Sequence, residues 1–219
     1  MKLFADTGNL KELEALASLG ILDGVTTNPS LMAKEPGDPR QILKQICALV
    51  KGPVSAEVVA TDAAGMIREG RDLASIDEHI VVKVPFTKDG VKACRTLASE
   101  GLRVNVTLIF SATQAWLAAK VGAAYVSPFV GRLDDVGTTG MNLVREIVDI
   151  FDNFEYSTEV LVASVRNPIH IVEAARMGAD VVTVPSAVIE QSFKHPLTDI
   201  GLAKFLQDWE KAQAATAKA

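Results

Sequence analysis

The stretch Ile80-Val81-Val82-Lys83-Val84-Pro85 is apolar on both sides of an extended chain except at one lysine. A strand buried on both faces is typical of a parallel sheet covered by helices. Lys83 is unexpected there, because stripping water from an ammonium group is costly unless the group is paired or functional. Burial favours the uncharged amine, which is a nucleophile. Lys83 is therefore a catalytic amine, a lysine whose ammonium group reaches water beyond the strand end, or half of a buried ion pair.

Short β-rich runs recur along the whole chain, at residues 3–6, 24–27, 54–59, 80–84, 103–109, 125–130, 160–164 and 181–184. Helical patterns separate them, and several begin at recognisable caps: Asn9 with Glu12, Ser111 with Gln114, and Asn167 before Pro168. An open doubly wound sheet would carry a G-x-G-x-x-G turn after its first strand, and the chain has none. The pattern predicts an α/β fold, a (β/α)8 TIM barrel formed as a single domain by residues 1–219.

A further segment, residues 196–219, follows the last unit. Leu202, Phe205, Leu206 and Trp209 recur in it at helical spacing. We expect an additional C-terminal helical arm, which either caps the barrel or packs on a neighbouring subunit. The second alternative makes the protein a homo-oligomer.

Composition excludes several classes of function. The net charge is -5 and the basic residues are scattered, so no nucleic-acid partner is expected. No apolar run reaches the roughly 18 residues that span a bilayer, and the first residues lack a signal-peptide pattern, which predicts a cytoplasmic protein without a membrane partner. The cysteines and histidines are not spaced along the sequence as metal ligands are. We expect Cys47 and Cys94 to be buried, and we assign no catalytic role to His79, His170 or His195.

Polar residues gather where the predicted strands end. They are Asp6, Asn28, Glu57, Lys83, Asn105, Thr107, Ser127, Arg132, Ser164 and Arg166. The carboxyl ends of barrel strands meet at one face, where the active sites of this fold lie. The period of two places Asn105 with Thr107, Ser127 with Phe129, and Ser164 with Arg166 on shared faces. Any single Asn, Thr or Ser among them is equally explained as a cap or turn residue.

These residue types suffice for carbonyl chemistry. The amine of Lys83 attacks a carbonyl, Glu57 transfers protons through a water held by Thr107, and Asp6 removes a proton from the hydroxyl beside the bond that breaks. Arg132 and Arg166, with Ser164, are suited to a phosphate. The alternative is that Asp6 and Glu57 form a salt bridge with Lys83 and keep it charged and unreactive.

Several motifs together resemble one family. Phe4-Ala5-Asp6-Thr7, Gly24-Val25-Thr26-Thr27-Asn28-Pro29-Ser30, Val82-Lys83-Val84-Pro85, Asn105-Val106-Thr107 and Ser127-Pro128-Phe129-Val130-Gly131-Arg132 are similar to the small transaldolases of the transaldolase and fructose-6-phosphate aldolase family. The resemblance implies a Schiff base on Lys83 without a metal or other cofactor, with Asp6 and Glu57 as proton carriers.

The same resemblance implies roles for the remaining residues. Asn28, Asn105 and Thr107 would hold the dihydroxyacetone moiety and a water, Ser127 would line the pocket, and Arg132, Ser164 and Arg166 would bind the phosphate of a phosphorylated sugar. It also implies a pentamer or decamer in which the arm reaches an adjacent subunit.

Two positions favour transaldolase activity over fructose-6-phosphate aldolase activity. The aldolases carry Gln in place of Glu57 and Tyr in place of Phe129. We therefore expect transfer of a dihydroxyacetone unit from sedoheptulose 7-phosphate to glyceraldehyde 3-phosphate, giving erythrose 4-phosphate and fructose 6-phosphate in the non-oxidative pentose phosphate pathway. The alternatives are a fructose-6-phosphate aldolase that releases free dihydroxyacetone and a non-catalytic barrel that binds sugar phosphates or serves assembly.

Overall fold

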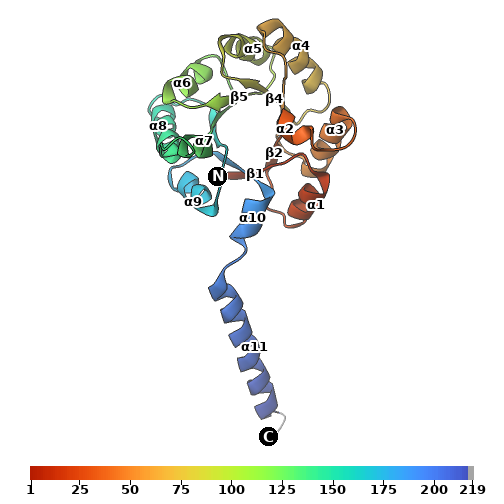
Figure 1. Cartoon of the computed structure of the whole chain (residues 1–219), viewed down its shortest axis with the longest axis vertical. Helices are drawn as coiled ribbons and strands as arrows, with labels where there is room; N and C mark the ends of the chain where they lie inside the picture. Colours follow the sequence, from red (N-terminus) through yellow and green to blue (C-terminus); the bar gives the residue numbers. More distant parts are fainter. Residues whose placement is uncertain (217–219) are drawn as a thin grey trace.

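A computed structural model of the chain describes residues 1–216. Its parallel strands close into a barrel in chain order, which confirms the predicted (β/α)8 fold (Figure 1). The strands are β1 (Lys2–Asp6), β2 (Gly24–Thr26), β3 (Val54–Glu57), β4 (Ile80–Pro85), β5 (Val104–Ile109), β6 (Tyr125–Pro128), β7 (Glu159–Val162) and β8 (Val181–Val184).

Helices surround the barrel as a ring in Figure 1. They are α1 (Leu10–Ser18), α2 (Pro29–Met32), α3 (Pro39–Val50), α4 (Ala63–Ala74), α5 (Lys88–Ser99), α6 (Ala112–Lys120), α7 (Val130–Asp134), α8 (Gly140–Asn153), α9 (Pro168–Arg176) and α10 (Ser186–Ser192), and the arm is α11 (Pro196–Thr216). The short helices α2, α7 and α10 directly follow strand ends, so they lie at the barrel face where polar residues were predicted.

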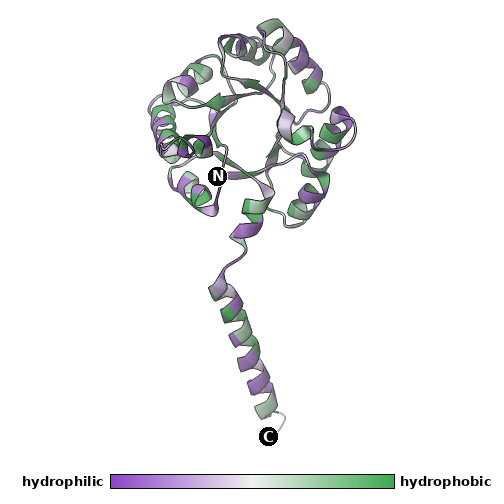
Figure 2. Cartoon of the chain, in the orientation of Figure 1, coloured by the Kyte–Doolittle hydropathy of each residue, from purple (hydrophilic) through white to green (hydrophobic). Residues whose placement is uncertain are grey.

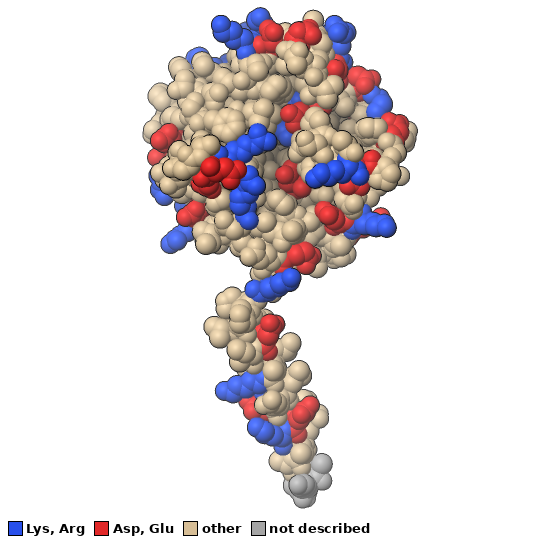
Figure 3. Space-filling view, viewed as in Figure 1, with Lys and Arg blue, Asp and Glu red and all other residues tan. Residues whose placement is uncertain are grey.

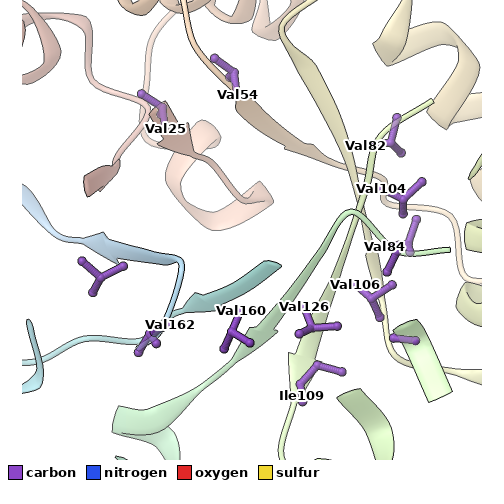
Figure 4. Close-up of a cluster of buried hydrophobic side chains, with 14 of the residues drawn as sticks. Val25, Val54, Val82, Val84, Val104, Val106, Ile109, Val126, Val160 and Val162 are labelled. Atoms are coloured by element: carbon purple, nitrogen blue, oxygen red, sulfur yellow. The ribbon is translucent and has the colours of Figure 1, made fainter. Parts of the chain in front are cut away.

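The barrel has separate apolar layers outside and inside. Alternate residues such as Val82, Val84 and Val104 belong to the cluster that includes the buried helix residues, and Figure 4 shows part of this outer layer. A second cluster, formed by Phe4, Val81, Tyr125, Leu161, Ala163 and Val181, fills the barrel interior. Because side chains alternate along a strand, the polar residues that follow these inner positions also face inward.

The predicted helix starts are confirmed, with one difference. Ser111 and Gln114 form a reciprocal capping box, and Asn167 caps α9 by accepting from the backbone N–H groups of Ile169 and His170. Asn9 accepts from the backbone N–H of Glu12, but the Glu12 carboxylate does not return the bond. The Glu12 carboxylate accepts instead from the hydroxyl groups of Thr7 and Ser186, which ties α1 to the start of α10.

Some strands end earlier than predicted. The expected run 160–164 stops at Val162, because Ser164 adopts a left-handed conformation with φ of 60°. The expected run 125–130 stops at Pro128; Phe129 makes one isolated bridge to Ala163, and α7 begins at Val130. These breaks turn the chain across the barrel mouth.

The two cysteines are buried, as predicted. Burial raises the pKa of the Cys47 and Cys94 thiols to about 12, so both thiols are protonated at neutral pH. Within residues 1–216, no helix combines the length and the apolar character required to cross a membrane.

The arm α11 projects away from the barrel (Figure 1), so it does not cap its own barrel. None of its described residues is buried, and Phe205 and Trp209 are 73% and 63% exposed. Figure 2 shows apolar residues interspersed with polar ones along its length. Residues 217–219 of the predicted arm lie outside the described residues.

Candidate active site

Lys83 lies at the centre of the polar layer inside the barrel. Strand register pairs it with Glu57 on one side and Asn105 on the other. The residue is 5% exposed; its Nζ lies 3.0 Å from Glu57 Oε2 and donates to the backbone oxygen of Thr27 at 3.0 Å. Glu57 is thus within reach either to pair with the ammonium or to accept its proton.

A cavity of about 250 Å³ opens at the carboxyl ends of the strands, and Lys83 forms part of its wall. Of the predicted site residues, it brings together Asp6, Asn28, Lys83, Ser127, Phe129, Arg132, Ser164 and Arg166. Glu57, Asn105 and Thr107 are not part of the wall. Figure 3 shows basic and acidic side chains beside one another around the hollow in the centre of this face.

Asp6 lies in the same cavity under two opposing influences. Burial raises the pKa of its carboxyl group above the ordinary value, whereas a hydrogen bond from Thr26 and the charge of Lys83 act to lower it. Thr26 Oγ1 donates to Asp6 Oδ1 at 2.8 Å and lies 2.6 Å from Thr183 Oγ1. Since Thr26 has a single hydroxyl proton, Thr183 must be the donor in the second bond. These two successive hydrogen bonds fix the orientation of the Asp6 carboxyl group.

Asn105 and Thr107 lie behind the cavity wall. Asn105 has no exposed surface; its Oδ1 accepts from Ser127 Oγ at 2.7 Å and its Nδ2 donates to Ser55 Oγ at 3.2 Å. Ser127 is thereby held in the wall by Asn105. The buried hydroxyl of Thr107 has no hydrogen-bond partner among the residues that the structure describes. An unsatisfied buried hydroxyl of this kind is suited to bind a water molecule or another small polar group.

Glu57 borders a second cavity of about 300 Å³, on the side of α2 and α3. Thr27 and Asn28 line this cavity as well, and the Glu57 side chain is 15% exposed. Asn28 caps α2, because its Oδ1 accepts from the backbone N–H of Leu31 at 3.0 Å. The cap leaves the Asn28 amide N–H groups available to the main cavity.

Two arginines stand on one side of the main cavity. The guanidinium carbon of Arg132, on α7, lies 5.5 Å from the centroid of the Phe129 ring. Arg166, in the loop after β7, donates from Nη2 to Asp135 Oδ2 at 2.9 Å. Two guanidinium groups facing one cavity provide a binding place for a dianion such as a phosphate.

Sequence reasoning missed Thr26, Ser55 and Thr183, which position Asp6 and Asn105. Each lies at an inward position of a strand, so the period of two was an available signal. The partner of each hydroxyl depends on strand register, which pairs Asp6 with Thr26 and Thr26 with Ser55.

The fold and the cavity together define a barrel with a buried amine, two carboxyl groups within the polar layer and an arginine-lined side. A family model described as Transaldolase/Fructose-6-phosphate aldolase matches residues 3–218. The chain belongs to this family, and the protein is an enzyme of the transaldolase family.

Relatives named "Probable transaldolase" match the chain over almost its entire length. One from Nitrosopumilus maritimus is 57% identical over 98% of this chain and 97% of its own. One from Syntrophobacter fumaroxidans is 58% identical over 97% and 98%, respectively. A solved thiamine phosphate pyrophosphorylase from Pyrococcus furiosus superposes with a TM-score of 0.59 over 85% of this chain and 86% of its own, at 18% identity. That last likeness concerns the fold alone.

Proposed function

We propose that this protein is a class I transaldolase that moves a dihydroxyacetone unit from sedoheptulose 7-phosphate to glyceraldehyde 3-phosphate through a Schiff base on Lys83. The observation that carries the proposal is the Lys83 amine, buried in the cavity wall with the Glu57 carboxylate 3.0 Å away. The family supports aldol-type chemistry. The choice of substrates rests on the residues around that amine.

The reaction begins with proton transfer from Lys83 to Glu57, which frees the amine electron pair. The amine attacks the ketone carbon of the sugar, one amine proton passes to the former ketone oxygen, and a carbinolamine forms. Glu57, now carrying the proton, returns it to the departing hydroxyl, so water leaves and an iminium forms. The unpartnered Thr107 hydroxyl supports a water relay for this step.

Carbon-carbon cleavage follows from the iminium, which withdraws electrons. Asp6 takes the proton of the C4 hydroxyl, the C3–C4 bond breaks, and its electron pair moves to the iminium to leave an enamine. Erythrose 4-phosphate departs as the aldehyde. Burial raises the pKa of Asp6, which makes it a stronger base for this proton than an ordinary aspartate. The steps then run in reverse with glyceraldehyde 3-phosphate and release fructose 6-phosphate.

Arg132, Arg166 and Ser164 bind the phosphate in this scheme, at the opposite end of the sugar from the reacting ketone. Ser127 and Asn28 contact the hydroxyl groups of the three-carbon unit, and Asn105 acts by holding Ser127. Charge-assisted bonds from two guanidinium groups select a phosphorylated sugar over its neutral counterpart.

The second candidate is a fructose-6-phosphate aldolase, because the family contains both activities. Glu57 and Phe129 favour transaldolase, since the aldolases resemble this chain but carry Gln and Tyr at those places. Phe129 brings no hydroxyl to the cavity wall and packs against Phe110 at a centroid distance of 6.0 Å.

The test is turnover of fructose 6-phosphate with and without erythrose 4-phosphate as acceptor. Efficient turnover that requires the acceptor is the expected result, and equal turnover without it would identify an aldolase. Borohydride reduction in the presence of fructose 6-phosphate should attach a three-carbon adduct at Lys83. If the protein binds sugar phosphates but shows neither an adduct nor turnover, the non-catalytic barrel is the remaining alternative.

A homo-oligomer and a cytoplasmic location are part of the proposal. Charged sugar phosphates do not cross a bilayer unaided, which suits an enzyme located with its substrates. The apolar face of the arm, formed by Leu202, Phe205, Leu206 and Trp209, has no cover within this chain's described residues. A pentamer or decamer in which a neighbour covers this face would bury it.

Sedimentation velocity of Trp209→Glu tests the assembly, with Gln207→Glu as the matched control on the same exposed helix. Dissociation of the first variant alone is expected, because only it places a charge in the apolar face. If both variants keep the assembly of the parent protein, the arm is not part of the subunit interface.

A further inference from the structure

His170 is a buried polar residue for which the chemistry above has no use. It lies in the first turn of α9 and is 8% exposed. Its Nδ1 lies 3.3 Å from the backbone nitrogen of Arg166, which donates to it. The acceptor role of Nδ1 requires the neutral ring to carry its proton on Nε2. Nε2, which carries that proton, lies 3.2 Å from Asp134 Oδ2 and so faces a carboxylate.

The two acidic residues at the end of α7 contact this histidine and Arg166. Asp134 Oδ1 accepts from the backbone N–H of Gly140 at 2.9 Å, which closes the turn between α7 and α8. The neighbouring Asp135 accepts from the side chain of Arg166 at 2.9 Å. The backbone of Arg166 is thus tied to α7 through His170, and its side chain is tied to α7 directly.

The helix α7 also carries Arg132 and lies directly against the Arg166 loop. The backbone N–H of Gly131 donates to the oxygen of Ser164 at 3.0 Å. A Cβ at Gly131 would lie 2.2 Å from that oxygen and 2.5 Å from Arg166 Nε. The two segments are therefore in backbone contact, and a displacement of either one moves both guanidinium groups relative to the cavity.

We propose that His170 is a positioning residue: its Asp134–His170–Arg166 relay sets the spacing of the two arginines and thereby the preference for phosphorylated over neutral sugars. The inference rests on the proposed function, because it assumes that Arg132 and Arg166 bind the phosphate. His170 does not touch the sugar. It acts through Arg166, so it affects phosphate recognition and leaves the chemistry at Lys83 unchanged.

The test compares His170→Asn and His170→Gln, since each retains one half of the relay. The Asn oxygen can replace Nδ1 as the acceptor for Arg166, and the Gln amide N–H can replace the Nε2–H that faces Asp134. Donor kinetics are measured with fructose 6-phosphate and with fructose, each with erythrose 4-phosphate as acceptor. The loss of one hydrogen bond predicts a rise in KM for fructose 6-phosphate of about 2- to 10-fold. kcat and the kinetics with fructose should be unchanged, and His170→Asn should be the less affected of the two.

His79→Gln is the matched control. His79 forms a similar pair with Asp77, at 2.7 Å, at the opposite end of the barrel. It should leave the ratio of kcat/KM for fructose 6-phosphate to that for fructose unchanged. An unchanged ratio in both His170 variants would overturn the inference, as would an equal loss with both sugars.

Arg166→Ala separates this inference from the proposed function. It should raise KM for fructose 6-phosphate by about 10- to 100-fold, because it removes a charge-assisted bond. If Arg166→Ala leaves this KM unchanged, the assigned phosphate site is wrong, and so is the inference. If Arg166→Ala raises KM and neither His170 variant does, the phosphate site holds and the inference alone fails.

Discussion

Replacing Lys83 with Met tests the proposed chemistry and the energetics of the buried amine together. Met has a similar length, so the aliphatic part of the side chain remains packed. The change removes the donor to the Thr27 oxygen and the partner of Glu57, each 3.0 Å from Nζ. Without the amine no Schiff base forms, so transfer activity should fall below detection.

The expected loss of stability follows from what happens to Glu57. Breaking a fully buried ion pair costs about 3–5 kcal/mol, because a charge is left without a partner. The Glu57 side chain is 15% exposed and borders the second cavity, so water reaches the carboxylate once Lys83 is gone. We therefore expect a smaller loss, about 1–3 kcal/mol, or a fall in Tm of about 2–12 °C.

Three measurements check this reasoning: fructose 6-phosphate turnover with an acceptor, borohydride trapping followed by mass spectrometry, and thermal denaturation. The double variant Lys83→Met/Glu57→Gln should regain most of the lost stability, because it removes both charges. Lys92→Met, at a lysine whose side chain is 69% exposed, is the control and should retain activity and Tm. Turnover by Lys83→Met within tenfold of the parent would refute the amine as nucleophile, and a double variant less stable than Lys83→Met would refute the energetics.

Three further outcomes are expected. Because burial raises the pKa of Asp6 in the folded state, its ionisation costs stability as the pH rises above about 3.9, so Asp6→Asn should have a higher Tm than the parent at pH 7 but not at pH 3. A parent more stable than this variant at pH 7 would contradict that sign. Thr107→Val keeps the shape of the side chain and removes the unpartnered hydroxyl, so single-turnover adduct formation should slow by about 10²- to 10⁴-fold with the fold intact; an unaltered rate would exclude the relay. Gly131→Ala forces α7 away from Ser164 and should lower the free energy of unfolding in urea by about 1–3 kcal/mol, whereas Gly201→Ala, which has open space around it, should not; equal stability of the two would show that α7 yields easily.

Most of the architecture was predictable because it depends on local patterns. Burial on both faces makes each strand a short aliphatic run, and the caps at Ser111 and Asn167 mark helix starts through bonds within a few residues. Lys83 was conspicuous for the same reason, since a charge within such a run is visible without any partner. The family resemblance extended this to the polar residues at the strand ends.

Which of those residues contact one another could be seen only in the tertiary structure. Register between neighbouring strands places Glu57 beside Lys83, and contact across β1, β2 and β8 joins Thr183 and Thr26 to Asp6. Asn105 and Thr107 lie behind the cavity wall. The sequence could not distinguish them from residues that form the wall, because the distance of an inward side chain from the cavity depends on the side chains of neighbouring strands.

His170 illustrates the same limit. It is an isolated histidine in the sequence and was assigned no role, yet the fold places it between Asp134 and the backbone of Arg166. The sequence by itself therefore determined the barrel, its helix starts and the unusual lysine, since these follow from side-chain burial and short-range hydrogen bonds. Only the closed barrel decided which hydroxyl, carboxyl and guanidinium groups meet, because those contacts join segments that are far apart in the chain.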